Sequence, residues 1–250
     1  MRKLFTVSGI LMSALLFVGC NKNNDNDQAE TPVAGVMAAN LATDLPPIGV
    51  ALSGRALSYS PLMYTSFTGG YLPVYPGNRP VSAYDASTGV SYATANYTFE
   101  PEKFYSLFVV GANENYRNVI VNDDFSSLSA TNGKAYIRYI NAIPDSAQST
   151  VTITANGSNA VNENASFASV SQFVEIEPGT VTIDVSNGST VAANRTISVE
   201  QRKVYTVLLI GDPASTSAEV QIRYIENGTL DEEDVASART SSSAQVIGSK

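Results

Sequence analysis

An internal repeat with a period near 100 residues constrains the fold of this chain more than any other feature. Three blocks recur in the same order at offsets of 101, 102 and 100 residues: 36–44 and 137–145, 71–77 and 173–179, and 102–107 and 202–207. The offset drifts by only one or two residues, which indicates a duplicated segment. A period of this length predicts two tandem domains, because solenoid repeats are only about 20–50 residues long.

Alternating apolar and polar residues predict that each repeat is built from β-strands. In the second repeat we expect strands at 135–141, 150–155, 172–177, 180–186, 203–210 and 219–225. Segment 203–210 is apolar almost throughout, which is typical of a central strand buried on both faces. Turn signals separate these segments, because Asn-Gly pairs favour the positive φ angles of tight hairpins. The Asn-Gly and Pro-Gly pairs begin at Asn132, Asn156, Pro178, Asn187 and Asn227.

About seven short strands per repeat predict an all-β fold of two tandem immunoglobulin-like β-sandwich domains. A small barrel is the alternative architecture. No segment after the first twenty residues shows an apolar period of 3.6, so we expect little helix. The expected organisation in chain order is a signal peptide at 1–19, a disordered acidic tether at 20–32, sandwiches at 33–128 and 133–228, and a polar C-terminal tail at 229–250.

The repeated blocks also carry a family resemblance. The run 137–145, the strand that ends at Pro178-Gly179, and the run from Lys203 to Gly211 resemble the bacterial family called domain of unknown function 4397. The resemblance covers about 135–225 well and 34–122 more loosely. It implies a secreted or surface-attached protein with β-sandwich domains, often in tandem. It implies no activity and no catalytic residues.

The first twenty residues have the pattern of a bacterial lipoprotein signal. A basic pair precedes an apolar run over 4–18, and Gly19 precedes Cys20, the only cysteine. This pattern predicts a secretory signal, and the run is too short for a membrane-spanning helix of about 20 apolar residues. The run ending at Cys20 resembles a lipobox, although Phe17 stands where Leu is usual. We expect palmitate and related lipid at the Cys20 thiol; an ordinary secretory signal is the alternative.

The segment after Cys20 predicts where the protein lies. Residues 21–31 contain one apolar residue, Ala29, and cannot bury enough surface to fold. Asp25 and Asp27 resemble the acidic residues that help direct lipoproteins to the outer face of the cell; a plain solvated linker is the alternative. We therefore expect a lipid-anchored protein of the cell outer membrane, exposed at the surface, with the periplasmic face as the alternative.

Composition excludes several classes of function. The formal net charge is −8, and it becomes −10 once the signal's two basic residues are removed. An acidic surface argues against nucleic-acid partners, whose phosphates require Lys and Arg. The chain has no histidine, which removes the commonest metal ligand and the usual general base near neutral pH. We predict no catalytic residues, no cofactor and no metal.

The tyrosines are the candidate ligand surface. Most of the 13 lie in the first repeat, and Tyr59, Tyr64, Tyr71 and Tyr75 follow one another closely. Tyrosine combines a flat apolar face with a polar tip and is enriched in recognition surfaces. An exposed group of these side chains would stack on sugar rings or bind a protein. The alternative is that they fill the sandwich core, and the absence of tryptophan weakens the sugar hypothesis.

Two further motifs are candidate sites. Asp123-Asp124 and the acidic run 231–234 could hold calcium, but neither has the ligand spacing of a calcium loop, so solvated loops are expected. Asp145-Ser146-Ala147 resembles the acceptor for O-glycosylation of exported bacterial proteins, which makes Ser146 a candidate modification site. Its alternative is a turn in which Asp and Ser bind backbone amides.

The sequence therefore predicts a non-catalytic cell-envelope lipoprotein that acts as a structural, adhesive or binding module. Its expected partners are the membrane, through Cys20, and a surface protein or glycan. One alternative is a glycan-binding accessory protein of a polysaccharide-uptake system. The other is a hydrolase that uses two carboxylates, for which no pair of residues stands out.

Overall fold

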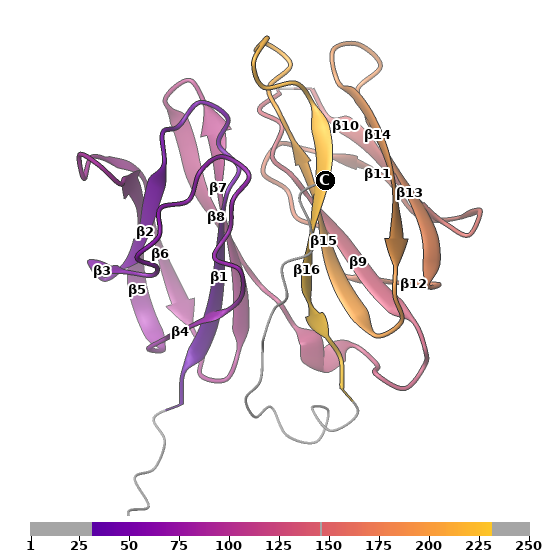
Figure 1. Cartoon of the computed structure of the whole chain (residues 1–250), viewed down its shortest axis with the longest axis horizontal. Helices are drawn as coiled ribbons and strands as arrows, with labels where there is room; N and C mark the ends of the chain where they lie inside the picture. The colour runs from indigo at the N-terminus through magenta and orange to yellow at the C-terminus, as the bar shows by residue number, and fades with distance from the viewer. Residues whose placement is uncertain (1–31, 146, 232–250) are drawn as a thin grey trace, which may run out of the picture. The chain divides into compact units, whose positions relative to one another are not determined.

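The computed structural model describes residues 32–145 and 147–231. These residues form 16 β-strands and one short 3-10 helix, Phe125–Ser127 (Figure 1), so the expected all-β fold is confirmed. Within the same ranges, no helix has the length and apolarity that a membrane crossing requires. The predicted signal peptide, nearly all of the tether and the tail beyond residue 231 lie outside the described residues.

The first repeat contains eight strands in two sheets. They are β1 (Ala34–Asn40), β2 (Ile48–Leu52), β3 (Arg55–Ala56), β4 (Leu72–Val74), β5 (Gly77–Asp85), β6 (Ser91–Phe99), β7 (Phe104–Ala112) and β8 (Asn115–Asn122). The order β4-β1-β7-β8 forms what we call inner sheet 1, and β3-β2-β5-β6 forms outer sheet 1.

The second repeat has the same number of strands in the same order. They are β9 (Ala135–Asn141), β10 (Ser149–Ala155), β11 (Ser158–Ala165), β12 (Val174–Ile176), β13 (Gly179–Ser186), β14 (Ala192–Val199), β15 (Lys203–Ile210) and β16 (Gln221–Thr229). Inner sheet 2 has the order β12-β9-β15-β16, and outer sheet 2 has the order β11-β10-β13-β14.

Strand pairing is equivalent in the two repeats. The first strand pairs in parallel with the seventh, as β1 with β7 and β9 with β15, whereas the other strand pairs are antiparallel. Each repeat therefore has two separate four-stranded sheets facing each other across a core. This arrangement is an immunoglobulin-like sandwich, which confirms the predicted fold over the barrel alternative.

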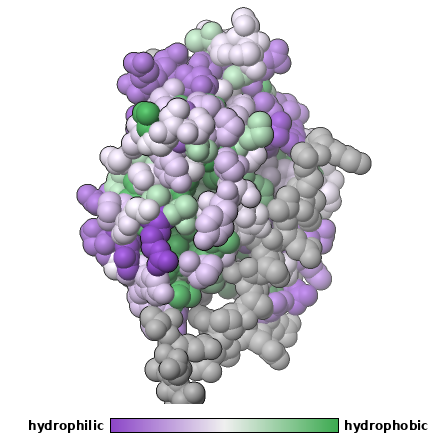
Figure 2. Space-filling model, turned by 60° about the vertical axis from the view of Figure 1, so that its left-hand side comes forward, coloured by the Kyte–Doolittle hydropathy of each residue, from purple (hydrophilic) through white to green (hydrophobic). Residues whose placement is uncertain are grey.

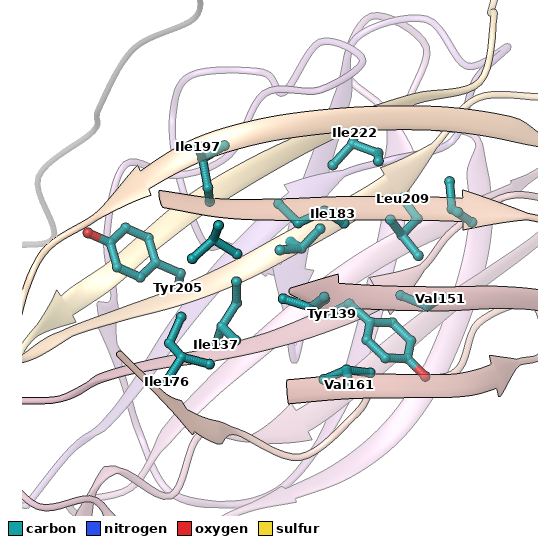
Figure 3. Packing of buried hydrophobic residues seen from close by; sticks show 14 of the residues in the cluster. Ile137, Tyr139, Val151, Val161, Ile176, Ile183, Ile197, Tyr205, Leu209 and Ile222 are labelled. Atoms are coloured by element: carbon teal, nitrogen blue, oxygen red, sulfur yellow. The ribbon is translucent and has the colours of Figure 1, made fainter. Parts of the chain in front are cut away.

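Each sandwich has an apolar core made by alternate residues of its two sheets. In the second repeat Ile137, Val151, Ile183 and Leu209 are fully buried or nearly so and point toward one another (Figure 3). The equivalent cluster of the first repeat includes fully buried Leu107. Because side chains alternate between the faces of a strand, the remaining residues of the inner sheets face away from these cores.

A third apolar cluster joins the two repeats. Pro32 and the described residues that follow it belong to one compact unit, in which buried residues of both inner sheets form one cluster. Its buried members are Met37, Ala39, Leu41, Tyr71, Phe108 and Val110 of the first repeat and Ile140, Ala142, Leu208, Ile210 and Ile225 of the second. The inner sheets thus pack on apolar residues on both faces, which explains the predicted burial of 203–210 on both faces.

One predicted turn is wrong. The pair Asn227-Gly228 lies inside β16, not at a turn. Val204 pairs with Gly228 and Tyr205 with Glu226, so Asn227 is the extra residue of a β-bulge. The bulge buries the Asn227 side chain, where it finds hydrogen-bond partners that are described below. Asn156-Gly157, by contrast, has φ values of 48° and 82° between β10 and β11, as a tight hairpin requires.

Candidate binding surface

The four candidate tyrosines do not form one exposed row. The side chain of Tyr59 is fully exposed, at 102% of its reference area, and that of Tyr75 is 57% exposed. Tyr64 is only partly exposed, and Tyr71 retains 7%. Only Tyr59 and Tyr75 of the four are therefore largely exposed to solvent.

Tyr71 belongs to the interior. Its ring makes edge-to-face contacts with Phe104 and Phe125, at centroid distances of 5.1 and 5.8 Å. Its hydroxyl donates to Asp123 Oδ2 at 2.6 Å and accepts from Asn227 Nδ2 at 2.9 Å. Burial, reinforced by the Asp123 carboxylate, raises the pKa of Tyr71 well above its usual value. Tyr71 is thus a protonated core residue and cannot line a ligand surface.

Tyr64 lies at the base of a loop, beside the second repeat. Burial raises the pKa of its phenol to about 12; of two charges in the second repeat, Arg223 lowers this pKa and Asp212 raises it. The neighbouring Thr65 accepts a hydrogen bond from Arg223 Nη1 at 3.2 Å. This contact places the loop base against β16, so Tyr64 is better suited to positioning the loop than to binding a ligand.

The loop that carries Tyr59 has no counterpart in the second repeat. After the two-residue strand β3 the chain leaves outer sheet 1, whereas the equivalent strand β11 continues over eight residues. We call residues 57–63 the tip loop. It holds exposed Tyr59 and Pro61, and Met63 is 61% exposed. Exposed apolar side chains on a loop held by a rigid sandwich are typical of recognition sites.

One buried residue fixes the tip loop to the sandwich. Leu62 is 4% exposed and exchanges two backbone hydrogen bonds with Ile48 of β2, at 2.8 and 3.0 Å. Asn40 Nδ2 also donates to the Leu62 carbonyl at 3.1 Å. Because Leu62 is anchored, its neighbours Pro61 and Met63 are held outward. Among the described residues, the other exposed large apolar side chains are Val33, Tyr75 and Val90, and in Figure 2 green areas are interrupted by polar and neutral ones.

Tyr75 lies apart from the tip loop. It precedes β5, whose first residue Gly77 pairs with Phe99 at one end of outer sheet 1. The tip loop follows β3 and is bound through Leu62 to Ile48 of β2, which pairs with Asp85 at the opposite end of β5. A ligand of small size would therefore not reach both tyrosines.

A second candidate surface lies on outer sheet 2 and is not among the sequence-based predictions. Its outward side chains are small and polar: Thr150, Thr152, Thr154, Asn159, Asn162, Asn164, Thr180, Thr182, Asp184, Ser186, Asn194, Thr196 and Ser198. Cross-strand hydrogen bonds link them, such as Thr150 Oγ1 to Asn164 Oδ1 at 3.0 Å and Thr154 Oγ1 to Asn159 Oδ1 at 2.8 Å. We call this the polar face. The pattern Thr-x-Thr-x-Thr at 150–154 was its available signal.

Two further candidate residues are the predicted modification sites. Cys20 and Ser146 lie outside the described residues. Asp145 Oδ1 accepts a hydrogen bond from the Ala147 amide at 3.0 Å, which is a bond that the alternative interpretation expects of the aspartate. Glycosylation of Ser146 stays a prediction, which a mass spectrum of the mature protein from its native host would check.

The expected solvated loop is wrong for one residue of the acidic pair, Asp123, and holds for the other, Asp124. Asp123 is buried, and Arg138 Nη2 lies 2.6 Å from its Oδ1. Asp124 is exposed and accepts from Ser126 Oγ at 2.5 Å. Over the described ranges, no three acidic, His or Cys side chains are grouped to hold a metal ion. Of the run 231–234, only Asp231 is described.

These observations define an all-β protein of two tandem sandwiches with solvent-exposed candidate binding surfaces. The chain belongs to the family described as domain of unknown function (DUF4397), whose model matches residues 34–148 and 135–240. The suspected resemblance is thereby confirmed. No match was found among curated proteins.

Several solved structures show a distant likeness. A "putative cell adhesion protein" from Parabacteroides distasonis is 9% identical, with a TM-score of 0.24 over 77% of this chain and 98% of that one. A similar protein from Bacteroides ovatus is 8% identical, with a TM-score of 0.23 over 80% and 99%. A family 41 carbohydrate-binding module from streptococcal virulence factors, which recognises α-glucan, is 7% identical, with a TM-score of 0.24 over 76% and 96%. At these TM-scores the likenesses carry no argument about this chain.

Proposed function

We propose that this protein is a lipid-anchored, non-catalytic adhesive module of the bacterial cell envelope that binds a surface protein through the tip loop. The observation that carries the proposal is the fully exposed Tyr59 on a loop that the second repeat lacks. Tyr59, Pro61 and Met63 present apolar surface that costs free energy to leave in water. Aromatic residues and methionine are enriched where proteins meet other proteins.

The state of the buried carboxylates supports a non-catalytic role. Asp123 is paired with Arg138, and Glu226 lies 3.3 Å from Lys203 Nζ. Asp85 accepts hydrogen bonds from Ser87, among others. Glycoside hydrolysis requires two carboxyl groups that face the same substrate. Carboxylates that are already bound to neighbours do not provide such a pair.

A binding measurement tests the tip loop. We would compare the chain from residue 21 onward with its Tyr59→Ser/Met63→Ser variant on panels of purified bacterial surface and extracellular-matrix proteins. We expect a partner whose binding weakens at least about tenfold in the variant, equivalent to about 1.4 kcal/mol. Val90→Ser is the matched control, because Val90 is 59% exposed on another loop of the same repeat. If the Tyr59→Ser/Met63→Ser variant binds every partner as tightly as the Val90→Ser control does, the tip loop is not the binding surface.

Glycan binding is the second candidate function, and the polar face favours it. This face offers hydroxyl and amide groups with a single charged residue, Asp184, which suits a neutral polysaccharide. A glycan array probed with the wild-type chain and with Thr152→Val/Thr182→Val tests this candidate. Silence on every glycan would discard it, and binding lost in the variant would place glycans ahead of proteins.

The lipid anchor is tested separately. Cleavage before Cys20 would leave an acylated cysteine, and two or more acyl chains hold a protein stably in a membrane. We expect radioactive palmitate to label the wild-type protein and the Cys20→Ser variant to leave the membrane fraction. Unlabelled wild-type protein, or a variant that fractionates with the membrane unchanged, would remove the anchor and the outer-membrane location.

A further inference from the structure

The two inner sheets contain equivalent positions that meet across the third apolar cluster. The register identifies them: Val36 pairs with Tyr105 in β1–β7, as Ile137 pairs with Tyr205 in β9–β15. The next positions along β1 and β9 are therefore Met37 and Arg138, and those along β7 and β15 are Ser106 and Thr206. Tyr105 pairs with Asn122 as Tyr205 pairs with Glu226, so the residues that follow, Asp123 and Asn227, correspond to each other. Val36 pairs with Leu72 as Ile137 pairs with Val174, so the residues that precede, Tyr71 and Phe173, also correspond.

A buried acid occupies this face in the first repeat. Asp123 Oδ2 accepts hydrogen bonds from Tyr71 and from Ser106, both at 2.6 Å. Arg138 of the second repeat provides the balancing charge, with Nη2 at 2.6 Å from Asp123 Oδ1. The side chains of this ion pair are 3% and 0% exposed, for the arginine and the aspartate. The acid is therefore neutralised only by the other repeat.

A buried base occupies the same face in the second repeat. Arg138 Nε donates to Thr206 Oγ1 at 3.0 Å, and its guanidinium lies 4.3 Å from the centroid of the Phe173 ring. Arg138 Nη2 also reaches across to Ser106 Oγ at 2.9 Å. Within the second repeat the guanidinium group contacts only the neutral groups of Thr206 and Phe173. Its counter-ion, Asp123, belongs to the first repeat.

Equivalent residues converge at the junction. Asp123 and its counterpart Asn227 both bind the Tyr71 hydroxyl, and Arg138 binds both Ser106 and its counterpart Thr206. Two copies of the first repeat meeting in this way would bury two carboxylates with no arginine. Two copies of the second would bury two guanidinium groups with no carboxylate. A buried charge without its partner is strongly destabilising.

We propose that these faces form an interface selective for unlike repeats: an inner sheet 1 binds an inner sheet 2, and neither binds its own kind. The shared apolar cluster supplies attraction that does not distinguish the two faces. The Asp123–Arg138 pair supplies the discrimination, since specificity requires a feature that penalises the wrong partner. The partner that fits each face is therefore a repeat of the other type.

The test begins with the folded full chain. A recognition sequence for a specific protease is inserted between Thr131 and Asn132, which are exposed and lie between the repeats. After cleavage, light and isotope-labelled samples are mixed, and native mass spectrometry identifies every pair of halves at micromolar concentration. We expect pairs of one first repeat and one second repeat, some of which combine a light half with a labelled half. Pairs of two identical repeats should be at least about tenfold rarer than random pairing gives. Random pairing, or halves that do not associate, would overturn the proposal.

A variant built from the chain's own equivalents completes the test. Asp123→Asn/Arg138→Met replaces each charge by the residue found at the equivalent position of the other repeat. We expect like pairs to rise toward the random proportion in this variant. Asp124→Asn is the matched control, because it removes an exposed charge next to Asp123, and its pairing should remain selective. If the double variant fails to fold, the wild-type measurement alone decides.

Discussion

At the scale of single residues, the Tyr71 hydroxyl joins the two repeats, because it donates to Asp123 and accepts from Asn227. Removing it leaves both partners short of a hydrogen bond in a buried site. We expect Tyr71→Phe to lower the free energy of unfolding by about 1–3 kcal/mol. The benzyl ring itself should be accepted, since Phe173 holds the equivalent position in the second repeat. Urea denaturation measures the change.

Tyr59→Phe is the control for this prediction. The Tyr59 side chain is fully exposed, so loss of its hydroxyl should change stability by less than about 0.5 kcal/mol. If the two substitutions change the free energy of unfolding equally, the Tyr71 hydroxyl does not stabilise the contact between the repeats.

A second residue-scale prediction concerns Gly111 at the end of β7. Its φ is +126°, and a Cβ atom there would lie 2.1 Å from the backbone oxygen of Asn115. Backbone atoms cannot rotate away, so we expect Gly111→Ala to cost at least about 3 kcal/mol in thermal or urea unfolding. Gly89 also has positive φ, +76°, but a Cβ there meets no atom within 4 Å. Gly89→Ala should therefore cost only about 1–2 kcal/mol, and a similar loss at Gly111 would contradict the close approach.

At the scale of elements, the β5–β6 hairpin is held by Asp85. Its Oδ1 accepts from the Ser87 amide at 2.7 Å, the Ser87 hydroxyl at 2.6 Å and the Thr88 amide at 3.0 Å, and Tyr92 donates to Oδ2 at 3.0 Å. The Ser87 hydroxyl bond and the two amide bonds hold the pKa of Asp85 well below its usual range. The ionised aspartate thus stabilises the folded hairpin.

This pKa shift predicts a pH-dependent effect of Asp85→Asn. A lowered folded-state pKa contributes stability above the unfolded value of about 3.9, and this contribution is lost as the pH falls toward the folded value. We expect the variant to melt below the wild type at neutral pH and the gap to narrow in acid below about pH 4. Asp124→Asn controls for net charge. A gap that stays constant with pH would contradict the assignment.

The elements were predictable to different degrees. Strands β9, β10, β13 and β15 follow clear alternation or a continuous apolar run, because they are central strands of their sheets. Strands β11 and β14, which lie at the edges of outer sheet 2, were not predicted. Edge strands bury fewer side chains, so runs such as SNAVNENA satisfy the backbone ladder without an apolar pattern.

The candidate site was less predictable than the fold. The alternating apolar pattern of a strand does not show whether a tyrosine is buried between the two repeats or exposed to solvent. Tyr71 and Tyr59 could therefore not be distinguished from the sequence. The bulge at Asn227 and the pairing of Asp123 with Arg138 depend on contacts between residues far apart in the chain. Local sequence patterns do not predict such contacts. The one available signal of a buried ion pair was Arg138, a charged residue within a largely apolar strand.

At the scale of the whole described molecule, the two repeats share a buried apolar core. Sequence repetition predicts two domains, each with its own core, and both cores are present. The third cluster, which includes Phe108 and Leu208, adds burial that neither repeat could achieve alone. Shared burial couples the stability of the repeats, because unfolding one exposes apolar surface of the other and removes the partner of its buried charge.

Scanning calorimetry of the chain from residue 21 onward tests this coupling most directly. If the shared cluster and the Asp123–Arg138 pair join the repeats, heating should give one transition whose calorimetric and van't Hoff enthalpies agree. Two separated transitions, or a van't Hoff enthalpy near half of the calorimetric value, would contradict the account.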